Sequence, residues 1–330
     1  MFDKLLYVLL GVAITLFLSV VHKTGSSDGG ELRDGAVGTE FTRRLGQGTF
    51  TNELIECQDT YAGVLGEEQL KSMRSETKGL IDERLREIDK INSVSVYFRD
   101  LNAGSWFGVD EDRQYVPASL LKVPTMIAFL KASYGGMDLL EQKVSLDRIY
   151  NVGGHLVDRQ SRMKVGSNYT ARELIEIMIR DSDNNAVTLL FEKVSGGISD
   201  LESIFADLGV PYSEESTGPI TARQYSSFFR VLYNASYLDR EDSEYALKLL
   251  SETNFDKALV AGVPSGIKVA HKFGERWLDP KDDKYFHDCG IIYYPKRPYL
   301  LCVMTKGQDF DYLVATVRNI SGLIYERLSE

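Results

Sequence analysis

Cysteine and histidine are scarce in this 330-residue sequence, and neither is clustered. The cysteines are Cys57, Cys289 and Cys302, and the histidines are His22, His155, His271 and His287. No two cysteines have Cys-x-x-Cys spacing, whereas structural metal sites take their ligands from Cys and His residues at short, regular spacings. The sequence therefore implies no metal site, and no motif in it implies an organic cofactor.

Runs of basic residues are also lacking. The chain has 38 Lys and Arg against 48 Asp and Glu, a formal net charge of −10, and no basic stretch interleaved with aromatic residues. Surfaces that bind nucleic acid concentrate positive charge to neutralise phosphates. The composition therefore argues against a nucleic-acid partner, and the acidic excess mainly favours solubility.

One long apolar run is present at the N-terminus. Residues 5–21, LLYVLLGVAITLFLSVV, carry no charge and are flanked by Lys4 and by His22-Lys23. The run is at the short end of what a bilayer-spanning helix needs. We interpret residues 1–22 as an uncleaved signal-anchor, or transmembrane, helix of a single-pass membrane protein. A cleaved signal peptide is the alternative, although no small-x-small cleavage site follows.

The remaining chain divides by composition. Residues 23–67 form a predicted juxtamembrane tether, rich in Gly, Ser, Thr and charge up to about residue 50, followed by a segment of uncertain structure at the domain edge. Residues 68–330 have enough apolar side chains for one large folded domain, because 43% of the whole sequence is hydrophobic. We expect this domain to be catalytic and to lie outside the cytoplasm, because of the chemistry described below.

Strand-like and helix-like patterns alternate in a simple order. A helical pattern over residues 67–92 precedes a hairpin of residues 93–99 and 103–109. Helical patterns fill the middle, and Thr170 with Glu173 predicts a capping box for one of them. Three strands (266–274, 286–294 and 299–306) and a helix over 309–328 close the chain. This order predicts an α+β fold, with an antiparallel sheet built from both ends of the domain and a helical middle region.

The last two strands carry two cysteines. If Tyr294 pairs with Tyr299 across the turn at residues 295–298, Cys289 and Cys302 lie diagonally opposed on one face. A disulfide between them is one interpretation. We favour two free buried cysteines, since Cys is among the most buried residue types.

The stretch PASLLKVPTMIAFL, residues 117–130, places Ser119 and Lys122 three residues apart at the start of an apolar helix. Residues at this spacing share a helix face, and a Lys near a Ser can take its proton and make it a nucleophile. Pro124 removes one helix hydrogen bond and frees the carbonyl of Leu120. The same Ser-x-x-Lys spacing begins at Ser75, Ser161 and Ser265, in charged or turn contexts without an apolar helix.

Two more polar motifs follow in order, Ser182-Asp183-Asn184 between two apolar helices and Lys272-Phe273-Gly274 in a strand. Together with the Ser119 motif they resemble the Ser-x-x-Lys, Ser-Asp-Asn and Lys-Thr/Ser-Gly motifs of the serine β-lactamase and penicillin-binding-protein superfamily, nearest to its class A branch. The resemblance covers roughly residues 68–330. It implies the β-lactamase/transpeptidase-like fold and a serine hydrolase.

The resemblance implies a catalytic role for three residues. Ser119 would attack a carbonyl and become acylated, Lys122 would act as its general base, and Ser182 would relay a proton to the leaving nitrogen. Asp183 would be structural and bind the loop backbone.

Substrate binding would fall to the other motif residues. Asn184 would hydrogen-bond the substrate amide, and Lys272 would favour an anionic substrate. Gly274, the last residue of the third motif, and Glu275 would also bind substrate. The backbone N–H groups of Ser119 and Glu275 would form the oxyanion hole.

Two departures from the family pattern bear on function. Phe273 replaces the Thr or Ser whose hydroxyl helps bind the substrate carboxylate, and its bulk is expected to narrow the cleft. One interpretation makes Arg276 the substitute partner for the substrate carboxylate, but we favour a solvated surface charge. Trp277 is expected to line the same rim of the cleft. The loop at residues 208–219 is short and contains Glu214 and Glu215 but no Glu-x-x-Leu-Asn pattern to position a deacylating water.

These observations predict a membrane-anchored, extracytoplasmic serine hydrolase that acts through a Ser119 acyl-enzyme on β-lactams or peptidoglycan peptides. The short loop favours one alternative, a D-alanyl-D-alanine carboxypeptidase or penicillin-binding protein with slow deacylation. Phe273 motivates another, a non-catalytic ligand-binding pseudoenzyme.

Overall fold

A computed structural model of the protein describes residues 49–51, 65–135, 138–150, 161–194, 198–211, 218–277 and 283–329. The chain divides into two compact units, residues 1–42 and 43–330, and every described residue belongs to the second. The predicted anchor at residues 1–22 and most of the predicted tether lie outside the described residues. Within the described ranges, no helix is both long enough and apolar enough to cross a membrane.

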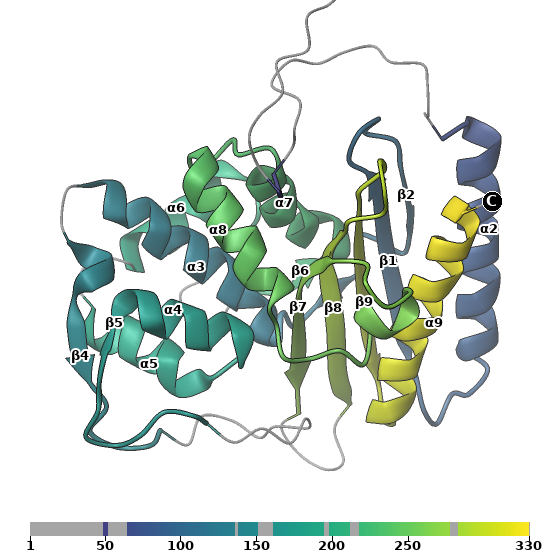
Figure 1. Ribbon diagram of the computed structural model, residues 1–330. Helices are drawn as coiled ribbons and strands as arrows, with labels where there is room; N and C mark the ends of the chain where they lie inside the picture. Colours follow the sequence, from purple (N-terminus) through teal and green to yellow (C-terminus); the bar gives the residue numbers. More distant parts are fainter. Residues whose placement is uncertain are drawn as a thin grey trace, which may run out of the picture. The chain divides into compact units, whose positions relative to one another are not determined.

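The second unit is organised on a five-stranded antiparallel sheet with the strand order β2-β1-β9-β8-β7 (Figure 1). The strands are β1 (Ser93–Asp100), β2 (Trp106–Val109), β7 (Val269–Arg276), β8 (Lys284–Ile292) and β9 (Tyr299–Gly307). The N-terminal hairpin joins the C-terminal strands through β1 and β9, where Val96 lies opposite Val303. The predicted α+β fold, with a sheet assembled from both ends of the domain, is confirmed.

Helices cover both faces of the sheet (Figure 1). On one face, α2 (Glu67–Arg84) and α9 (Phe310–Ser329) contact each other and the strands, and the short 3-10 helix η4 (Val260–Gly262) contacts α9. The helical middle region lies on the other face, where α7 and α8 contact the strands. Its helices are α3 (Lys122–Ala132), α4 (Ala171–Arg180), α5 (Asn184–Lys193), α6 (Ile198–Asp207), α7 (Ala222–Tyr233) and α8 (Arg240–Ser251).

Shorter elements connect this region. They are the 3-10 helices η1 (Ala118–Leu121), η2 (Ser133–Gly135) and η3 (Leu139–Glu141), and the strand pairs β3 (Gln114–Tyr115) with β6 (Ile220–Thr221) and β4 (Lys143–Ser145) with β5 (Asn168–Thr170). The predicted capping box is present at the start of α4. Thr170 Oγ1 accepts the N–H of Glu173 at 3.1 Å, and Glu173 Oε2 accepts the N–H of Thr170 at 2.8 Å.

Apolar side chains form one core on each face of the sheet, because successive residues of a strand point to opposite sides. On β7, Ala270 belongs to the core beneath the helical region, whereas Val269 and Phe273 belong to the core beneath α2 and α9. Helix α3 is buried on all sides from Lys122 to Leu130, as its apolar sequence predicts. This burial fixes the chain that follows Ser119.

Two sequence predictions need correction. The helix expected over residues 67–92 ends at Arg84, and the chain turns before β1, which leaves Ile88 73% exposed. The last hairpin pairs Ile292, rather than Tyr294, with Tyr299. Its six-residue connection keeps two further residues out of the ladder, and both its prolines lack the N–H that a ladder needs.

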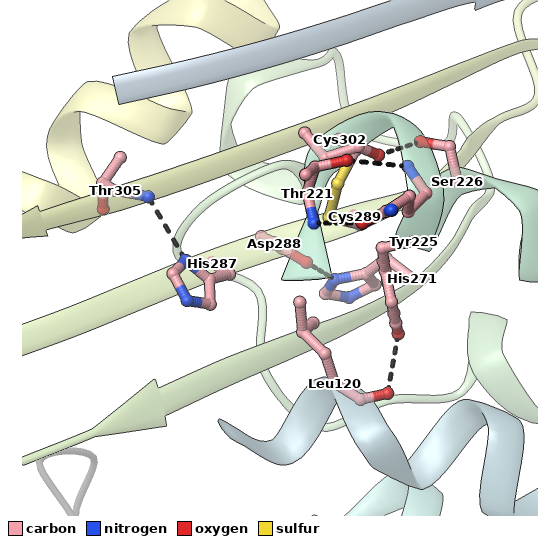
Figure 2. Close-up of a disulfide and its surroundings, with 12 residues drawn as sticks. Leu120, Thr221, Tyr225, Ser226, His271, His287, Asp288, Cys289, Cys302 and Thr305 are labelled. Carbon is pink, nitrogen blue, oxygen red and sulfur yellow. Dashed lines mark hydrogen bonds and ion pairs between the residues drawn. A yellow bond between two sulfur atoms is a disulfide. The ribbon is translucent and has the colours of Figure 1, made fainter. Parts of the chain in front are cut away.

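The register places Cys289 directly opposite Cys302, and the two are joined by a disulfide (Figure 2). The prediction of two free cysteines is therefore wrong. Both residues are fully buried in the core beneath the helical region.

A short piece of the N-terminal chain packs onto this domain. The Phe50 ring is buried in the core beneath the helical region and lies edge-on to Tyr293, whose hydroxyl donates to the Phe50 carbonyl at 2.9 Å. The backbone N–H groups of Thr49, Phe50 and Thr51 all donate to the carboxylate of Glu244 on α8. The domain core therefore includes a residue that precedes position 65.

Candidate active site

Ser119 lies in the 3-10 helix η1, one turn ahead of α3. The residue before it, Ala118, has a φ of 52°, in the left-handed region that residues with a Cβ rarely adopt. Such strained positions persist only where neighbouring contacts hold them, and they concentrate at functional sites. The backbone therefore presents Ser119 at a tight turn rather than in a regular helix.

Lys122 connects Ser119 to the second motif. Its Nζ donates to Ser119 Oγ at 3.1 Å and to Asn184 Oδ1 at 2.7 Å. It also donates to the carbonyl and hydroxyl oxygens of Ser182, at 2.7 and 3.1 Å. The lysine is only 5% exposed, so its amine is held among these oxygens with little access for water.

Ser182 connects the second motif to the third. With a φ of 53°, it turns its carbonyl and its hydroxyl toward the same amine, that of Lys122. Its hydroxyl also accepts a hydrogen bond from Lys272 Nζ at 2.9 Å. Because a hydroxyl can accept two hydrogen bonds and donate one, the Ser182 proton stays available for a third group.

The chain around Ser182 is fixed from both sides. Asp183 caps α5 by accepting the N–H of Asn185 at 2.7 Å, and its second oxygen accepts a hydrogen bond from the Ser161 hydroxyl. Asn185 Oδ1 accepts the N–H of Tyr150 at 2.7 Å. Asp183 therefore does bind the loop backbone, and the loop that carries Ser182 is tied to two neighbouring segments.

Strand β7 is an edge strand of the sheet and packs against η1. A Cβ at Gly274 would stand 3.0 Å from the Leu120 nitrogen and 3.0 Å from the Pro117 oxygen, so any larger residue would press η1 away from the strand. Lys272 precedes it with its side chain fully buried, and Glu275 follows with 7% exposure. All the predicted site residues thus lie around η1, on three separate parts of the chain.

The Phe273 ring does not fill the space beside Ser119. It is 1% exposed and stacks on Phe255 with the ring centroids 4.2 Å apart, in the core beneath α2 and α9. Lys272 Nζ lies 4.2 Å from the ring centroid and donates to the Phe273 carbonyl at 2.9 Å. The expectation that this ring narrows the cleft is therefore not met, because the ring is packed within the domain.

The remaining residues named from the sequence are at or beyond the end of β7. Arg276 is the last residue of the strand, and both Arg276 and Trp277 are half-buried. The Trp277 indole N–H has no hydrogen-bond partner within the described part of the chain. Glu214 and Glu215 lie outside the described residues, so the deacylation loop stays a prediction.

Sequence reasoning missed two residues that hold the backbone beside Ser119, Tyr225 and His287; Figure 2 shows the contact of Tyr225 with Leu120. The hydroxyl of Tyr225, on α7, donates to the Leu120 carbonyl at 2.9 Å, and burial raises the pKa of this tyrosine well above its usual value. His287, on β8, contacts the Val116 carbonyl through Nε2 at 2.9 Å. The one sequence signal for these contacts was the Leu120 carbonyl that Pro124 frees. It did not indicate which residue would donate a hydrogen bond to that carbonyl.

Comparison with known proteins identifies the family and the fold. A family model described as the β-lactamase enzyme family matches residues 80–328. The chain is 22% identical over 253 residues to Beta-lactamase 3 of Bacillus cereus, which covers 71% of this chain and 77% of that protein.

Among solved structures, PBP-A aligns at 23% identity with a TM-score of 0.64, over 78% of this chain and 96% of its own. A mutant of PBP-A, solved as an acyl-enzyme complex with penicillin G, aligns at 24% identity with the same TM-score and coverage. The TLA-1 extended-spectrum β-lactamase aligns at 21% identity with a TM-score of 0.67, over 79% of this chain and 100% of its own.

Fold and family match define one class, the serine hydrolases of the β-lactamase type. The chain belongs to the β-lactamase enzyme family, because the family model spans most of its length. The resemblance inferred from the three motifs is thereby confirmed.

Proposed function

We propose that the protein forms an acyl-enzyme through Ser119 with β-lactams or with peptidoglycan peptides that β-lactams mimic. The observation that carries the proposal is the set of contacts of Lys122, whose Nζ reaches Ser119 Oγ, Ser182 Oγ and Asn184 Oδ1 within 3.1 Å. A nucleophile in hydrogen-bond contact with a base that other groups orient is the arrangement expected for covalent catalysis.

In the acylation step, Ser119 Oγ bonds to the substrate carbonyl carbon while its proton passes to the amine of Lys122. For this step the amine of Lys122 must be neutral, so that its nitrogen has a lone pair to take the proton. The backbone N–H groups of Ser119 and Glu275 would stabilise the oxyanion that forms. Two aimed donors of this kind contribute several kcal/mol, on the order of 3 kcal/mol each.

The intermediate then collapses with cleavage of the carbon–nitrogen bond. Ser182 donates its hydroxyl proton to the leaving nitrogen and recovers one from Lys122, so the proton taken from Ser119 ends on the leaving group. Lys272 holds the Ser182 oxygen from the other side at 2.9 Å. Asn184, whose oxygen binds Lys122 at 2.7 Å, would present its amide N–H groups to the substrate amide.

The sequence contains few candidate residues for the last step, removal of the acyl group by water. The short loop at residues 208–219 has no Glu-x-x-Leu-Asn pattern, so we propose slow deacylation and a penicillin-binding or D-alanyl-D-alanine carboxypeptidase activity. The penicillin G acyl-enzyme of the PBP-A mutant, a protein of similar fold, supports the acylation step by similarity. The intact set of contacts around Lys122 argues against a non-catalytic binding module.

The test uses the purified full-length chain and a fluorescent penicillin, followed by gel electrophoresis over time. We expect stable labelling of the wild type and none of Ser119→Ala. Lys122→Met should label at least about 10³-fold more slowly, because general bases typically contribute 10²- to 10⁴-fold and the Lys122 amine also donates to Ser182. Transient labelling with release of product would indicate a β-lactamase. A folded wild type that never labels would overturn the proposal for this substrate class.

The same proposal includes attachment to a membrane, with the domain outside the cytoplasm. It is supported by the uncharged run at residues 5–21, which lies outside the described residues. Full-length protein should stay with the membrane fraction after alkaline carbonate extraction, and it should be digested by protease added outside intact cells. Release by carbonate would contradict the anchor, and protection from protease would contradict the orientation.

A further inference from the structure

His287 lies on β8 directly opposite Gly274 of β7 and is fully buried. Paired residues of neighbouring strands point to the same face of a sheet. Gly274 is the residue whose missing side chain admits η1. The His287 imidazole therefore lies on the face of the sheet against which the segment carrying Ser119 packs.

Both ring nitrogens of His287 have backbone partners, and these fix its tautomer. The N–H of Thr305 on β9 points at Nδ1 at 3.2 Å, so Nδ1 must accept. The hydrogen is then on Nε2, which donates to the Val116 carbonyl at 2.9 Å. Burial lowers the pKa of His287 to about 4, so the imidazole remains neutral near pH 7 and keeps this arrangement. The ring thus links the centre of the sheet to the chain just before the nucleophile.

The contact is close to the nucleophile along the chain. Only Pro117 and Ala118 separate Val116 from Ser119, and Ala118 has the left-handed φ of 52°. On the other side of Ser119, Tyr225 holds the Leu120 carbonyl at 2.9 Å. The strained turn is therefore held at both ends by buried side chains that come from other elements.

We infer that His287 is a positioning residue for acylation. By holding the Val116 carbonyl, it fixes where the backbone N–H and the hydroxyl of Ser119 lie relative to Lys122 and to Gly274. The inference rests on the proposed function, in which this N–H is an oxyanion donor. A shift of this segment weakens an interaction made in the transition state, so it slows the acylation step and leaves non-covalent binding of substrate largely unchanged.

Two amide variants separate the contacts of His287. In His287→Gln, the side-chain NH₂ replaces Nε2 and can still donate to Val116. In His287→Asn, the shorter side chain replaces Nδ1, so it can accept from Thr305 but does not reach Val116. His271→Asn is the matched control, because His271 is also buried in this sheet but binds Asp288 at 2.7 Å rather than the nucleophile segment.

The readout is the acylation of full-length protein by penicillin in stopped-flow kinetics, which separates the acylation rate constant from the dissociation constant. We expect His287→Asn to lower the rate constant about 10- to 100-fold with a nearly unchanged dissociation constant. His287→Gln should stay within about fivefold of wild type, and His271→Asn within about threefold. Equal rates for the two His287 variants, or an equal loss in His271→Asn, would overturn the inference.

Hydrogen exchange of the peptide spanning residues 115–122 supplies a readout that needs no substrate. Its amides should exchange faster in His287→Asn than in His287→Gln and His271→Asn, measured at equal distance below each melting temperature. If the wild type does not react with penicillin but the variants differ in exchange as expected, the proposed substrate is contradicted and the positioning role is supported. Identical exchange in all three variants would overturn the positioning role itself.

Discussion

The two faces of the five-stranded sheet bury different kinds of groups. Beneath α2 and α9, Phe273 stacks on Phe255, and the buried pair of His271 and Asp288 holds the N–H of Leu259. Beneath the helical region, the same strands place their side chains around the nucleophile segment instead. Alternate residues of β7 and β8 therefore have different surroundings. Those on one face pack in the core beneath α2 and α9, and those on the other face contact the segment that carries Ser119.

The nucleophile face depends on polar contacts and on close backbone approach. Lys272 reaches Ser182, Gly274 admits η1, and His287 holds the Val116 carbonyl. Substitutions on this face should therefore slow acylation as well as lower stability. On the face toward α9 they should lower stability and leave acylation nearly unchanged, and three predictions test the difference.

The largest effect is expected from Phe273→Thr, which restores the residue type that the family motif has at this position. The smaller side chain leaves a cavity in the core beneath α9 and should lower the free energy of unfolding by about 4 kcal/mol. Acylation of the folded variant should change less than threefold (about 0.6 kcal/mol or less), because the ring lies in the core beneath α9 and its one contact with the site is with the Lys272 amine, which keeps its hydrogen bond to Ser182.

Urea unfolding and penicillin acylation at low temperature would measure the two effects of Phe273→Thr. Phe255→Ala, which removes the stacking partner, is the control for loss of core packing alone. A tenfold faster acylation in Phe273→Thr than in Phe255→Ala would show that the introduced hydroxyl reaches the substrate. The predicted difference between the two faces of the sheet would then be wrong at this position.

A slightly smaller effect should accompany acidification. Burial lowers the pKa of His287 from 6.5 to about 4, so between these values the unfolded chain binds a proton that the folded chain does not. Stability from this residue is therefore complete above pH 6.5 and is lost as the pH falls toward 4. The loss should total about 3 kcal/mol, at about 1.4 kcal/mol for each pH unit.

Urea unfolding of the wild type and of His287→Gln at pH 7 and at pH 4 would isolate this contribution. Because glutamine does not titrate, the variant should lose about 3 kcal/mol less than the wild type over this range. Parallel pH dependence of the two proteins would contradict the buried neutral histidine on the nucleophile face.

The smallest effect is expected from Gly274→Ala. The added Cβ would stand 3.0 Å from the backbone of η1 and force it outward, which should slow acylation about tenfold and cost about 1–2 kcal/mol of stability. Gly79→Ala, in α2, is the matched control, because a Cβ there has open space and should stabilise the helix by up to about 1 kcal/mol. Unchanged acylation in Gly274→Ala would show that η1 tolerates displacement.

Features set by residues near one another in sequence could be predicted. The spacing of Ser119 and Lys122, the capping box of Thr170 and Glu173, and the carbonyl freed by Pro124 each depend on a few consecutive residues. The order of strands and helices was enough for the fold class, because one sheet has to be assembled from both ends of the domain.

Features set by strand register could not be predicted. A shift of two residues in the last hairpin separates a diagonal from a direct pairing of Cys289 and Cys302. The side of the sheet to which Phe273 points, and the residue that lies opposite Gly274, follow only once the strands are aligned. Tyr225 is 105 residues from the carbonyl it binds, and no local pattern indicates that partner.

The packing of Phe50 has a mechanical consequence. Among the described residues, a force transmitted along the chain from its N-terminal side first meets three successive N–H groups that bind Glu244 on α8, and the Phe50 ring that enters the core. At these residues the load passes into α8 and, through Tyr293, to the end of β8. A version of the protein truncated at residue 52 would lack this attachment and one of its core side chains.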